Sequence, residues 1–238
     1  MSCQNGWGVI PQDAIAPNEL RNACQFFAST AAKRLIRIKE PCIIPVFLRK
    51  TKRHERKITM SKKVLIISSS PRKGGNSDIL CDAFAEGAKE SGHAVEKVRI
   101  AALKIGYCTG CYACQKTGKC AIKDDAQGVI DKMMAADVIV LASPVYFYSI
   151  CAQLKALIDR TVVVYPNLTN KRFYYILTMA DTNRDKFDGS LAALRGFLDC
   201  CEGSEECGMV CADGVYEKGT INGTKFIAEA KALGKRIK

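Results

Sequence analysis

The chain has 238 residues, 48% of them hydrophobic, which is enough for one ordinary domain with a buried core and an extension. No apolar run approaches the ~18–20 residues of a membrane span, and the first residues lack the basic start and apolar core of a signal peptide. We therefore expect a cytoplasmic protein with no membrane partner.

The extension is predicted at residues 1–59, which hold 11 Lys and Arg against four Asp and Glu, a net charge of +7 out of +12. A basic arm that binds nucleic acid would have this charge, but a solvated extension without a nucleic-acid partner is favoured. Residues 49–57 are a charge run, and from Met60 the pattern becomes regular. We expect residues 1–59 to be disordered or upstream of a true start at Met60, and residues 60–238 to form the domain.

Strands and helices alternate after Met60. Short apolar runs predict strands covered on both faces, and helical periods lie between them. The strands are expected at residues 64–67, 95–100, 137–143, 172–179 and 207–212. The helices are expected at residues 76–91, from 124 or 125 to 134, and at 152–163, 191–200 and 225–237. This order predicts an α/β fold with a parallel sheet, whose ligand site lies beyond the carboxyl ends of the strands.

The loop after the first strand, residues 68–77, contains hydroxyls, Arg72, Lys73 and two glycines, and it opens into a helix. Backbone N–H groups at a helix start bind phosphate well, and an arginine adds charge-assisted bonds. The loop has neither the dinucleotide motif G-x-G-x-x-G nor the nucleotide-triphosphate loop, so a monoester phosphate fits best. The alternative is an ordinary polar turn.

Four cysteines follow the second strand with the spacing C-x2-C-x2-C-x5-C, namely Cys108, Cys111, Cys114 and Cys120. Thiolates this close together can hold a [4Fe-4S] cluster, which is the favoured interpretation. A dithiol without metal and a zinc site are the alternatives. Disulfide-dense proteins are small and secreted, so most of the 13 cysteines are expected to be reduced or metal-bound.

The loop after the third strand contains three consecutive aromatic residues, Tyr146, Phe147 and Tyr148. Aromatic side chains at the carboxyl edge of a sheet can hold a flat heteroaromatic ring, although packing under the next helix or at a subunit contact is an alternative. A phosphate loop and a ring loop at one switch point together predict a flavin mononucleotide (FMN) site.

The remaining cysteines and the histidines are weaker signals. Cys207 and Cys211 are expected to share one face of a strand, so with Cys200 and Cys201 they could form a second metal site. Small buried hydrophobes are the favoured interpretation of these four. His54 and His93 lack ligand-like neighbours and are expected at the surface.

The two loops resemble the flavodoxin-like NAD(P)H-dependent FMN reductase family, and within it most closely the iron–sulfur flavoproteins. The family's phosphate segment S-P-R-x-x-x-N, followed by Ser or Thr, is matched by Ser70, Pro71, Arg72, Asn76 and Ser77. Its S-P-V-Y segment is matched by Ser143, Pro144, Val145 and Tyr146, and the helix at residues 153–160 is also similar. One departure is Ser69, where many members have Gly.

This resemblance implies a three-layer sandwich with a five-stranded parallel sheet in the order 2-1-3-4-5, FMN as cofactor, and a homo-oligomer, either a dimer or a tetramer. FMN would be bound by Ser70, Arg72, Asn76, Ser77, Ser143, Pro144, Val145, Tyr146, Phe147 and Tyr148.

The predicted function is an FMN-dependent oxidoreductase that takes electrons from NAD(P)H or a reduced carrier. No catalytic acid or base is required, because hydride is transferred to the flavin itself. The alternative is a non-catalytic electron carrier that receives electrons from ferredoxin.

Overall fold

The computed structural model describes residues 60–238 of the chain. The extension predicted for residues 1–59, the hypothesis of a start at Met60 and the surface position expected for His54 lie outside this range. Within residues 60–238, no helix combines the length and the apolar character that crossing a membrane requires.

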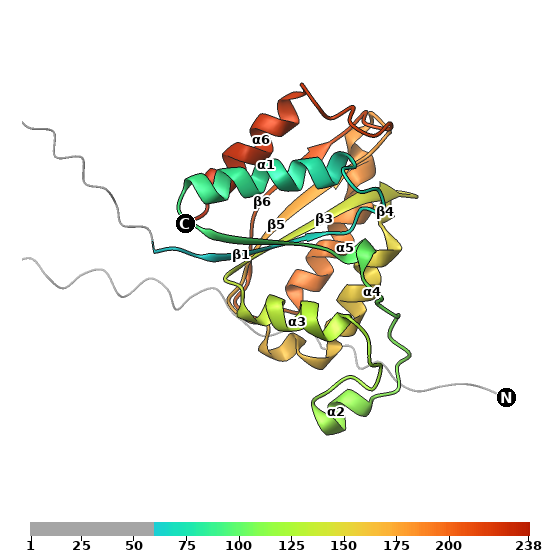
Figure 1. The fold of residues 1–238 in the computed structure, drawn as a ribbon. Coiled ribbons are helices and arrows are strands. Elements are labelled where there is room, and N and C mark those ends of the chain that lie inside the picture. Colours follow the sequence, from blue (N-terminus) through green and yellow to red (C-terminus); the bar gives the residue numbers. More distant parts are fainter. Residues whose placement is uncertain (1–59) are drawn as a thin grey trace, which may run out of the picture. The chain divides into compact units, whose positions relative to one another are not determined.

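Five parallel strands form the central sheet, in the order β2-β1-β3-β5-β6 (Figure 1). Counted along the chain this is the order 2-1-3-4-5, so the expected fold class is confirmed. The central strands are continuous apolar runs because helices cover both of their faces. The strands are β1 Lys63–Ser68, β2 Ala94–Arg99, β3 Val138–Tyr146, β5 Arg172–Thr178 and β6 Glu205–Ala212.

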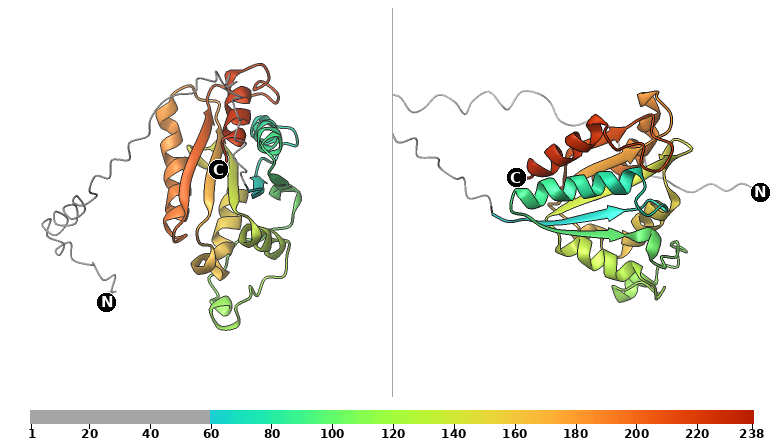
Figure 2. Two further views of the ribbon diagram at one scale, coloured as in Figure 1. Left: turned by 90° about the vertical axis from the view of Figure 1, so that its left-hand side faces the viewer. Right: turned by 45° about the horizontal axis from the view of Figure 1, so that its top comes forward.

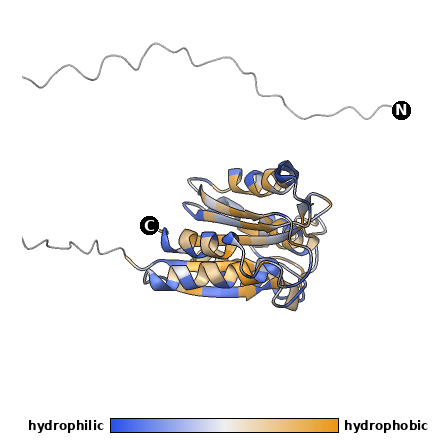
Figure 3. Ribbon diagram, turned by 90° about the horizontal axis from the view of Figure 1, so that it is seen from above, coloured by the Kyte–Doolittle hydropathy of each residue, from blue (hydrophilic) through white to orange (hydrophobic). Residues whose placement is uncertain are grey.

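Helices form the outer two layers, with α1 and α6 on one face of the sheet and α3, α4 and α5 on the other (Figure 2). Each face has its own buried cluster of side chains, and much of the hydrophobic colour in Figure 3 lies on the strands between them. The helices are α1 Asn76–Glu90, α2 Ala113–Thr117, α3 Ala126–Ala135, α4 Ala152–Arg160, α5 Asp188–Asp199 and α6 Lys225–Lys235.

Several short elements have no clear signal in the sequence. The helix expected over residues 152–163 ends at Arg160 and continues as a 3-10 turn, Thr161–Val163. Further 3-10 turns are Ile100–Ala102, Tyr165–Asn167 and Arg184–Phe187. α2 is a single turn inside residues 107–121, the segment that carries Cys108, Cys111, Cys114 and Cys120 and is called the cysteine loop below.

The aromatic loop after β3 is a tight hairpin. A two-residue strand, β4 Ser149–Ile150, pairs antiparallel with the end of β3, where Val145 faces Ile150 and Tyr146 faces Ser149. Phe147 and Tyr148 form the turn with φ of 50° and 58°, which is the left-handed region. Two-residue hairpins require these angles, and Asn or Gly usually supplies them at less cost than an aromatic residue.

A bulge in β6 contradicts the expectation that Cys207 and Cys211 share a face. The pairing with β5 shifts between Phe173 and Tyr174, where Gly208 faces Tyr174. Residues four apart in a regular strand point the same way, but the extra residue of a bulge reverses the order. Cys207 therefore packs on the α1–α6 face, and Cys211 is buried on the α3–α5 face.

The expectation that His93 is a surface residue is wrong, since its exposed fraction is 5%. Its Nδ1 accepts a hydrogen bond from the Lys62 N–H at 3.2 Å, and its Nε2 lies 3.3 Å from the Ile237 carbonyl oxygen. Because Nδ1 accepts, the proton is on Nε2, which donates to Ile237. His93 thus connects the residue before β1 to the segment after α6.

Candidate functional site

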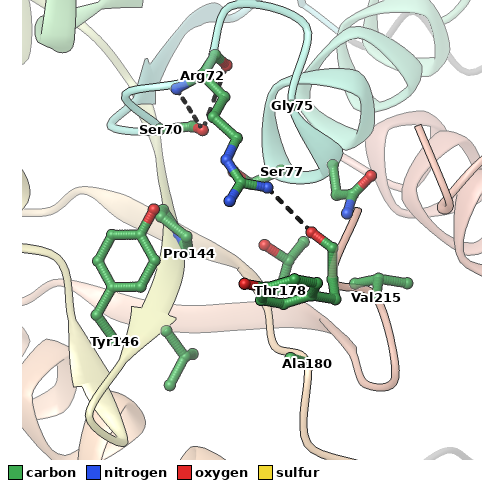
Figure 4. Close-up of a pocket in the computed structure, with 12 residues that line it drawn as sticks. Ser70, Arg72, Gly75, Ser77, Pro144, Tyr146, Thr178, Ala180 and Val215 are labelled. Atoms are coloured by element: carbon green, nitrogen blue, oxygen red, sulfur yellow. Dashed lines mark hydrogen bonds between the residues drawn. The ribbon is translucent and has the colours of Figure 1, made fainter. Parts of the chain in front are cut away.

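A cavity opens at the carboxyl ends of the strands, where the fold places ligands (Figure 4). The loop after β1 and the start of α1 form one wall, the end of β3 a second, and the segments after β5 and β6 the rest (Figure 4). The lining residues are Ser70, Arg72, Gly75, Asn76, Ser77, Pro144, Val145, Tyr146, Thr178, Ala180, Val215 and Tyr216.

The start of α1 is the polar end of this cavity. Gly75 precedes the helix without a side-chain cap, so the first N–H groups of α1 lack that partner. The Ser77 hydroxyl lines the cavity, is buried and has no hydrogen-bond partner in the described structure. A buried hydroxyl beside uncapped helical N–H groups suits an anion that accepts hydrogen bonds.

The phosphate-loop candidates Ser70 and Arg72 lie next to Ser77. The Ser70 Oγ accepts from the Arg72 N–H at 3.3 Å, which shapes the turn. A Cβ on Gly75 would lie 3.0 Å from this Oγ and from the Arg72 carbonyl oxygen, so a side chain there would force the turn to shift by a few tenths of an ångström. The Arg72 guanidinium reaches across the cavity and donates to the Tyr216 carbonyl at 3.0 Å (Figure 4).

Asn76 lines the cavity, but its side chain is engaged elsewhere. Its Nδ2 donates to the Glu217 carbonyl at 2.9 Å and to the Thr220 hydroxyl at 3.3 Å. Its Oδ1 accepts from the Gly219 N–H at 2.9 Å. The amide thus fixes the segment after β6, and only the backbone N–H of Asn76 remains for a ligand.

Ser69, the departure from the family pattern, has no left-handed backbone. Its hydroxyl donates to the Ala142 carbonyl at 2.6 Å, and the Cys151 thiol donates to the same hydroxyl at 3.0 Å. A serine is therefore accommodated here without strain, and it connects the loop after β1 to the start of α4.

A buried carboxylate, Asp78, lies behind the loop. It accepts from the Ser68 hydroxyl at 2.8 Å and the Gly74 N–H at 2.9 Å, and it pairs with Lys97 at 3.2 Å and Arg99 at 3.5 Å. Burial alone would raise the pKa of Asp78, but the N–H of Gly74, the Ser68 hydroxyl and Lys97 together hold that pKa below its ordinary value.

The other predicted ring residues belong to the end of β3 and its hairpin. Pro144, Val145 and Tyr146 line the cavity, while Phe147 and Tyr148 line a neighbouring hollow with Met179 and Asp181. The two hollows share Val145 and Ala180, so they are neighbours.

Hydrogen bonds hold the hairpin in place. The Tyr148 hydroxyl donates to Asp181 at 3.1 Å, whereas Phe147 is fully exposed. Ser143 is buried beneath the hairpin, and its Oγ accepts from the Cys151 N–H at 2.9 Å. Ser143 thus positions the start of α4 and does not line the cavity.

The four cysteines of the C-x2-C-x2-C-x5-C segment line one cavity of about 200 Å³, together with Ile122, Arg160 and Val163. All ten cysteines of residues 60–238 are free thiols, so no disulfide competes for them. The N–H of Ala113 and the Thr109 hydroxyl lower the pKa of the Cys111 thiol. In chemical type and number, four free thiols are the donor set that a thiolate-held metal group requires.

The thiols are not in a coordinating arrangement. Within the described range, no three His, Cys, Asp or Glu side chains are close enough together to hold a metal ion. The same finding leaves the second metal site at Cys200, Cys201, Cys207 and Cys211 without support, and the bulge in β6 places Cys207 and Cys211 on opposite faces of the sheet.

Sequence reasoning missed the wall that follows β6. Val215 and Tyr216 line the cavity, as do Thr178, the last residue of β5, and Ala180 just after it. An aromatic residue shortly after a strand, as at Tyr216, was the available signal. Asp78 and Arg160 were also missed, because a charged residue on a helix is ordinarily solvated.

The sheet order and a pocket suited to a phosphate at the switch point together define a flavodoxin-like α/β protein. The family model described as NADPH-dependent FMN reductase matches residues 62–200. The chain belongs to this family.

Curated relatives with similar sequences are named iron–sulfur flavoproteins. One from Archaeoglobus fulgidus is 43% identical over 98 residues, which are 41% of this chain and 44% of the relative. One from Methanosarcina thermophila is 43% identical over 102 residues, which are 43% of this chain and 53% of the relative. The matched part of the chain thus spans about half the length of these relatives.

Solved structures of low sequence identity share the fold. An NAD(P)H:quinone oxidoreductase from Methanothermobacter marburgensis has a TM-score of 0.58 at 16% identity, covering 74% of this chain and 96% of that one. An FMN-dependent NADH-azoreductase from Bacillus anthracis, solved with FMN, has a TM-score of 0.55 at 19% identity, covering 73% of this chain and 98% of that one.

Proposed function

We propose that this chain is an FMN-dependent oxidoreductase that transfers electrons from NAD(P)H or a reduced carrier through FMN. The observation that carries the proposal is the buried Ser77 hydroxyl, which has no partner in the described structure and lies in the cavity at the uncapped start of α1. A phosphate monoester would accept hydrogen bonds from this hydroxyl and from the first N–H groups of the helix. Membership of the family supports FMN as the compound that carries the phosphate.

The loop residues have separate roles in this proposal. Arg72 adds charge-assisted hydrogen bonds to the phosphate, and Ser77 donates from its hydroxyl. Ser70 shapes the turn through the Arg72 N–H, and Asn76 contributes its backbone N–H.

The end of β3 would hold the flavin ring. Pro144, Val145 and Tyr146 form a wall of the cavity next to the phosphate end, and Phe147 and Tyr148 line the neighbouring hollow. Bound FMN supplies the hydride and electron chemistry, so these residues position the ring and no acid or base is needed.

The cysteine cavity would hold a [4Fe-4S] cluster through Cys108, Cys111, Cys114 and Cys120. Two facts support this: the four thiols are free and line one cavity, and the curated relatives are named iron–sulfur flavoproteins. When bound, a cluster supplies single-electron transfer. A dithiol or a zinc site remains the alternative use of these residues.

The partners and the location are further parts of the proposal. We expect a cytoplasmic homo-oligomer, a dimer or a tetramer, in which the fully exposed Phe147 is a candidate contact. The cysteine segment carries Lys116 and Lys119, and Lys123 follows it. This positive charge would attract an acidic donor such as ferredoxin.

The test is anaerobic reconstitution of the full chain with FMN, iron and sulfide, followed by desalting, a visible spectrum and metal analysis. We expect flavin bands with iron and sulfide at about four each per chain. Arg72→Ala should weaken FMN binding about 10- to 100-fold, because a hydrogen bond to a charged group contributes ~1.5–3 kcal/mol. Cys120→Ser should lose iron and keep FMN.

The controls are Arg195→Ala and Cys200→Ser, which alter exposed side chains outside both cavities. Unchanged retention of FMN by Arg72→Ala would contradict the phosphate site. Flavin bands without iron in the wild type would leave an FMN reductase and remove the cluster.

A further inference from the structure

Arg160, the last residue of α4, is the largest fully buried side chain in the described part of the chain, with an exposed fraction of 1%. Its guanidinium forms a two-point ion pair with Asp124, at 2.7 Å from Nη1 and 3.0 Å from Nη2. Nη1 also donates to the Gly106 carbonyl at 2.8 Å, and Nη2 to the Ile122 carbonyl at 3.1 Å. One side chain thus binds both ends of the cysteine loop.

Asp124 binds the same two ends from the other side. It accepts from the Gly106 N–H at 2.8 Å and from the Ala126 N–H, the first of α3, at 3.0 Å. Burial would raise the pKa of Asp124, but Arg160 and these two N–H groups hold it below its ordinary value, so the carboxylate is charged. A buried arginine is stable only when its charge is paired and bonded in this way.

Between these ends, the cysteine loop is held by hydrogen bonds within its own segment. Within the described structure, the hydrogen bonds of residues 107–121 stay inside the segment, as between the Gln115 N–H and the Tyr112 carbonyl and between the Gly118 N–H and the Cys114 carbonyl. Tyr107 and Tyr112 are exposed. The Asp124–Arg160 pair is therefore the main connection between the loop and the folded core.

Arg160 also faces the thiols. It lines the cavity formed by the four cysteines, and its Nε is buried without a hydrogen-bond partner in the described structure. A buried N–H without an acceptor is costly, which indicates that an acceptor is present in the functional state. The sulfurs of the cavity, Cys120 among them, are acceptors of the right kind.

We propose that Asp124 and Arg160 are positioning residues that close the cysteine loop before any metal binds, and that the free Nε–H of Arg160 donates to a sulfur of the loaded site. This inference rests on the proposed iron–sulfur function. Closing a loop costs entropy, so a loop closed in advance lowers the cost of bringing four thiolates together. A donor and a positive charge beside the sulfurs favour the reduced cluster.

The first test measures hydrogen exchange in the metal-free full chain, so it does not depend on a cluster. In Arg160→Gln, the bonded amides of Gly106, Asp125 and Ala126 should exchange at least about tenfold faster than in the wild type, since a loss of ~1.4 kcal/mol is tenfold. Arg195→Gln breaks a similar two-point pair with Glu206 on the surface and should leave these amides unchanged. If Arg160→Gln does not fold, Asp124→Asn is measured in its place.

The second test uses the reconstituted protein. Arg160→Lys keeps the charge but removes the Nε donor, and we expect faster loss of iron to a chelator and a lower reduction potential by redox-titrated EPR. Amide exchange in Arg160→Gln equal to that of the wild type would overturn the role of the pair in closing the loop. A reduction potential of Arg160→Lys equal to that of the wild type would overturn the donation by Nε. If the wild type takes up no iron but the loop amides still exchange faster in Arg160→Gln, the cluster is refuted. The role of the pair in closing the loop then stands.

Discussion

At the scale of single residues, Asp78 shows how a carboxylate can shape a phosphate site that it never lines. The N–H of Gly74 is bonded to this carboxylate, so the loop after β1 keeps its curvature with no ligand bound. Lys97 and Arg99 offset the negative charge, which would otherwise repel a phosphate a few residues away.

The pKa of Asp78 predicts a loss of stability in acid. Its folded pKa lies below its ordinary value, so its contribution is complete above about pH 4 and is lost as the pH falls through the folded pKa. Asp78→Asn should lower the free energy of unfolding at pH 7 by about 1–3 kcal/mol and flatten its fall below about pH 4. Urea unfolding at several pH values measures both effects.

The matched control for that experiment is Asp131→Asn, whose carboxylate is exposed on α3 beside Gln127. It should leave both the stability at pH 7 and its pH dependence close to those of the wild type. Equal pH dependence in Asp78→Asn and the wild type would show that Asp78 does not contribute.

Residue roles were harder to predict than residue positions. Ser77 and Arg72 line the cavity as the motif predicts, since their place follows from the strand, the turn and the helix start. Asn76 lines it too, but its side chain binds a segment more than 140 residues further along. Nothing within the motif indicates that distant partner.

At the scale of elements, two glycines allow α1 and α6 to pack almost backbone to backbone. A Cβ on Gly234 would lie 2.2 Å from the Phe84 carbonyl oxygen, and one on Gly87 would lie 2.0 Å from the Lys231 carbonyl oxygen. The helices must therefore move apart to accept any side chain at these positions.

Gly234→Ala should destabilise the fold by about 1–3 kcal/mol, because the strain of overpacking exceeds the ~1 kcal/mol that alanine gains in a helix. The control is Gly196→Ala on α5, where a Cβ would have no neighbour within 4 Å. That variant should be neutral or more stable by up to about 1 kcal/mol. Urea unfolding compares them, and a stabilised Gly234→Ala would contradict the close packing.

Long elements could be predicted and short irregular ones could not. The strands and helices of the sandwich have clear periods and buried faces over many residues. β4 has two residues, α2 is one turn, and the bulge at Gly208 is a change of pairing that appears only when β5 is placed beside β6. The wrong prediction for Cys207 and Cys211 followed from this last limitation.

At the scale of the whole molecule, the fold was predictable because five apolar strands alternating with helices leave few topologies. The part of the phosphate cavity formed by residues after β6 was not predictable, since it depends on which strands are neighbours in the sheet. The phosphate cavity and the cysteine cavity share no lining residue, so one could function without the other.

The choice between an enzyme and an electron carrier is a question about the whole molecule. The hollow along Phe147 and Tyr148 lies beside the proposed flavin cavity and shares Val145 and Ala180 with it, so a second ligand bound there would lie next to the flavin. We therefore expect NADH or NADPH alone to bleach the bound flavin under anaerobic conditions. Stopped-flow absorbance measures this, and bleaching only by reduced ferredoxin would identify a carrier.

Helix α4 runs from beside the loop after β1 to the cysteine cavity. The residue before it, Cys151, donates from its thiol to the Ser69 hydroxyl in the loop after β1, and the helix ends at Arg160, which lines the cysteine cavity. Each residue of a helix turns the chain by about 100° and advances it by about 1.5 Å. One residue inserted or deleted in α4 would therefore rotate Arg160 out of the cysteine cavity while Cys151 stayed in place. The length of this helix therefore sets the spacing between the loop after β1 and the cysteine cavity. Relatives that keep both sites should keep the length of the helix.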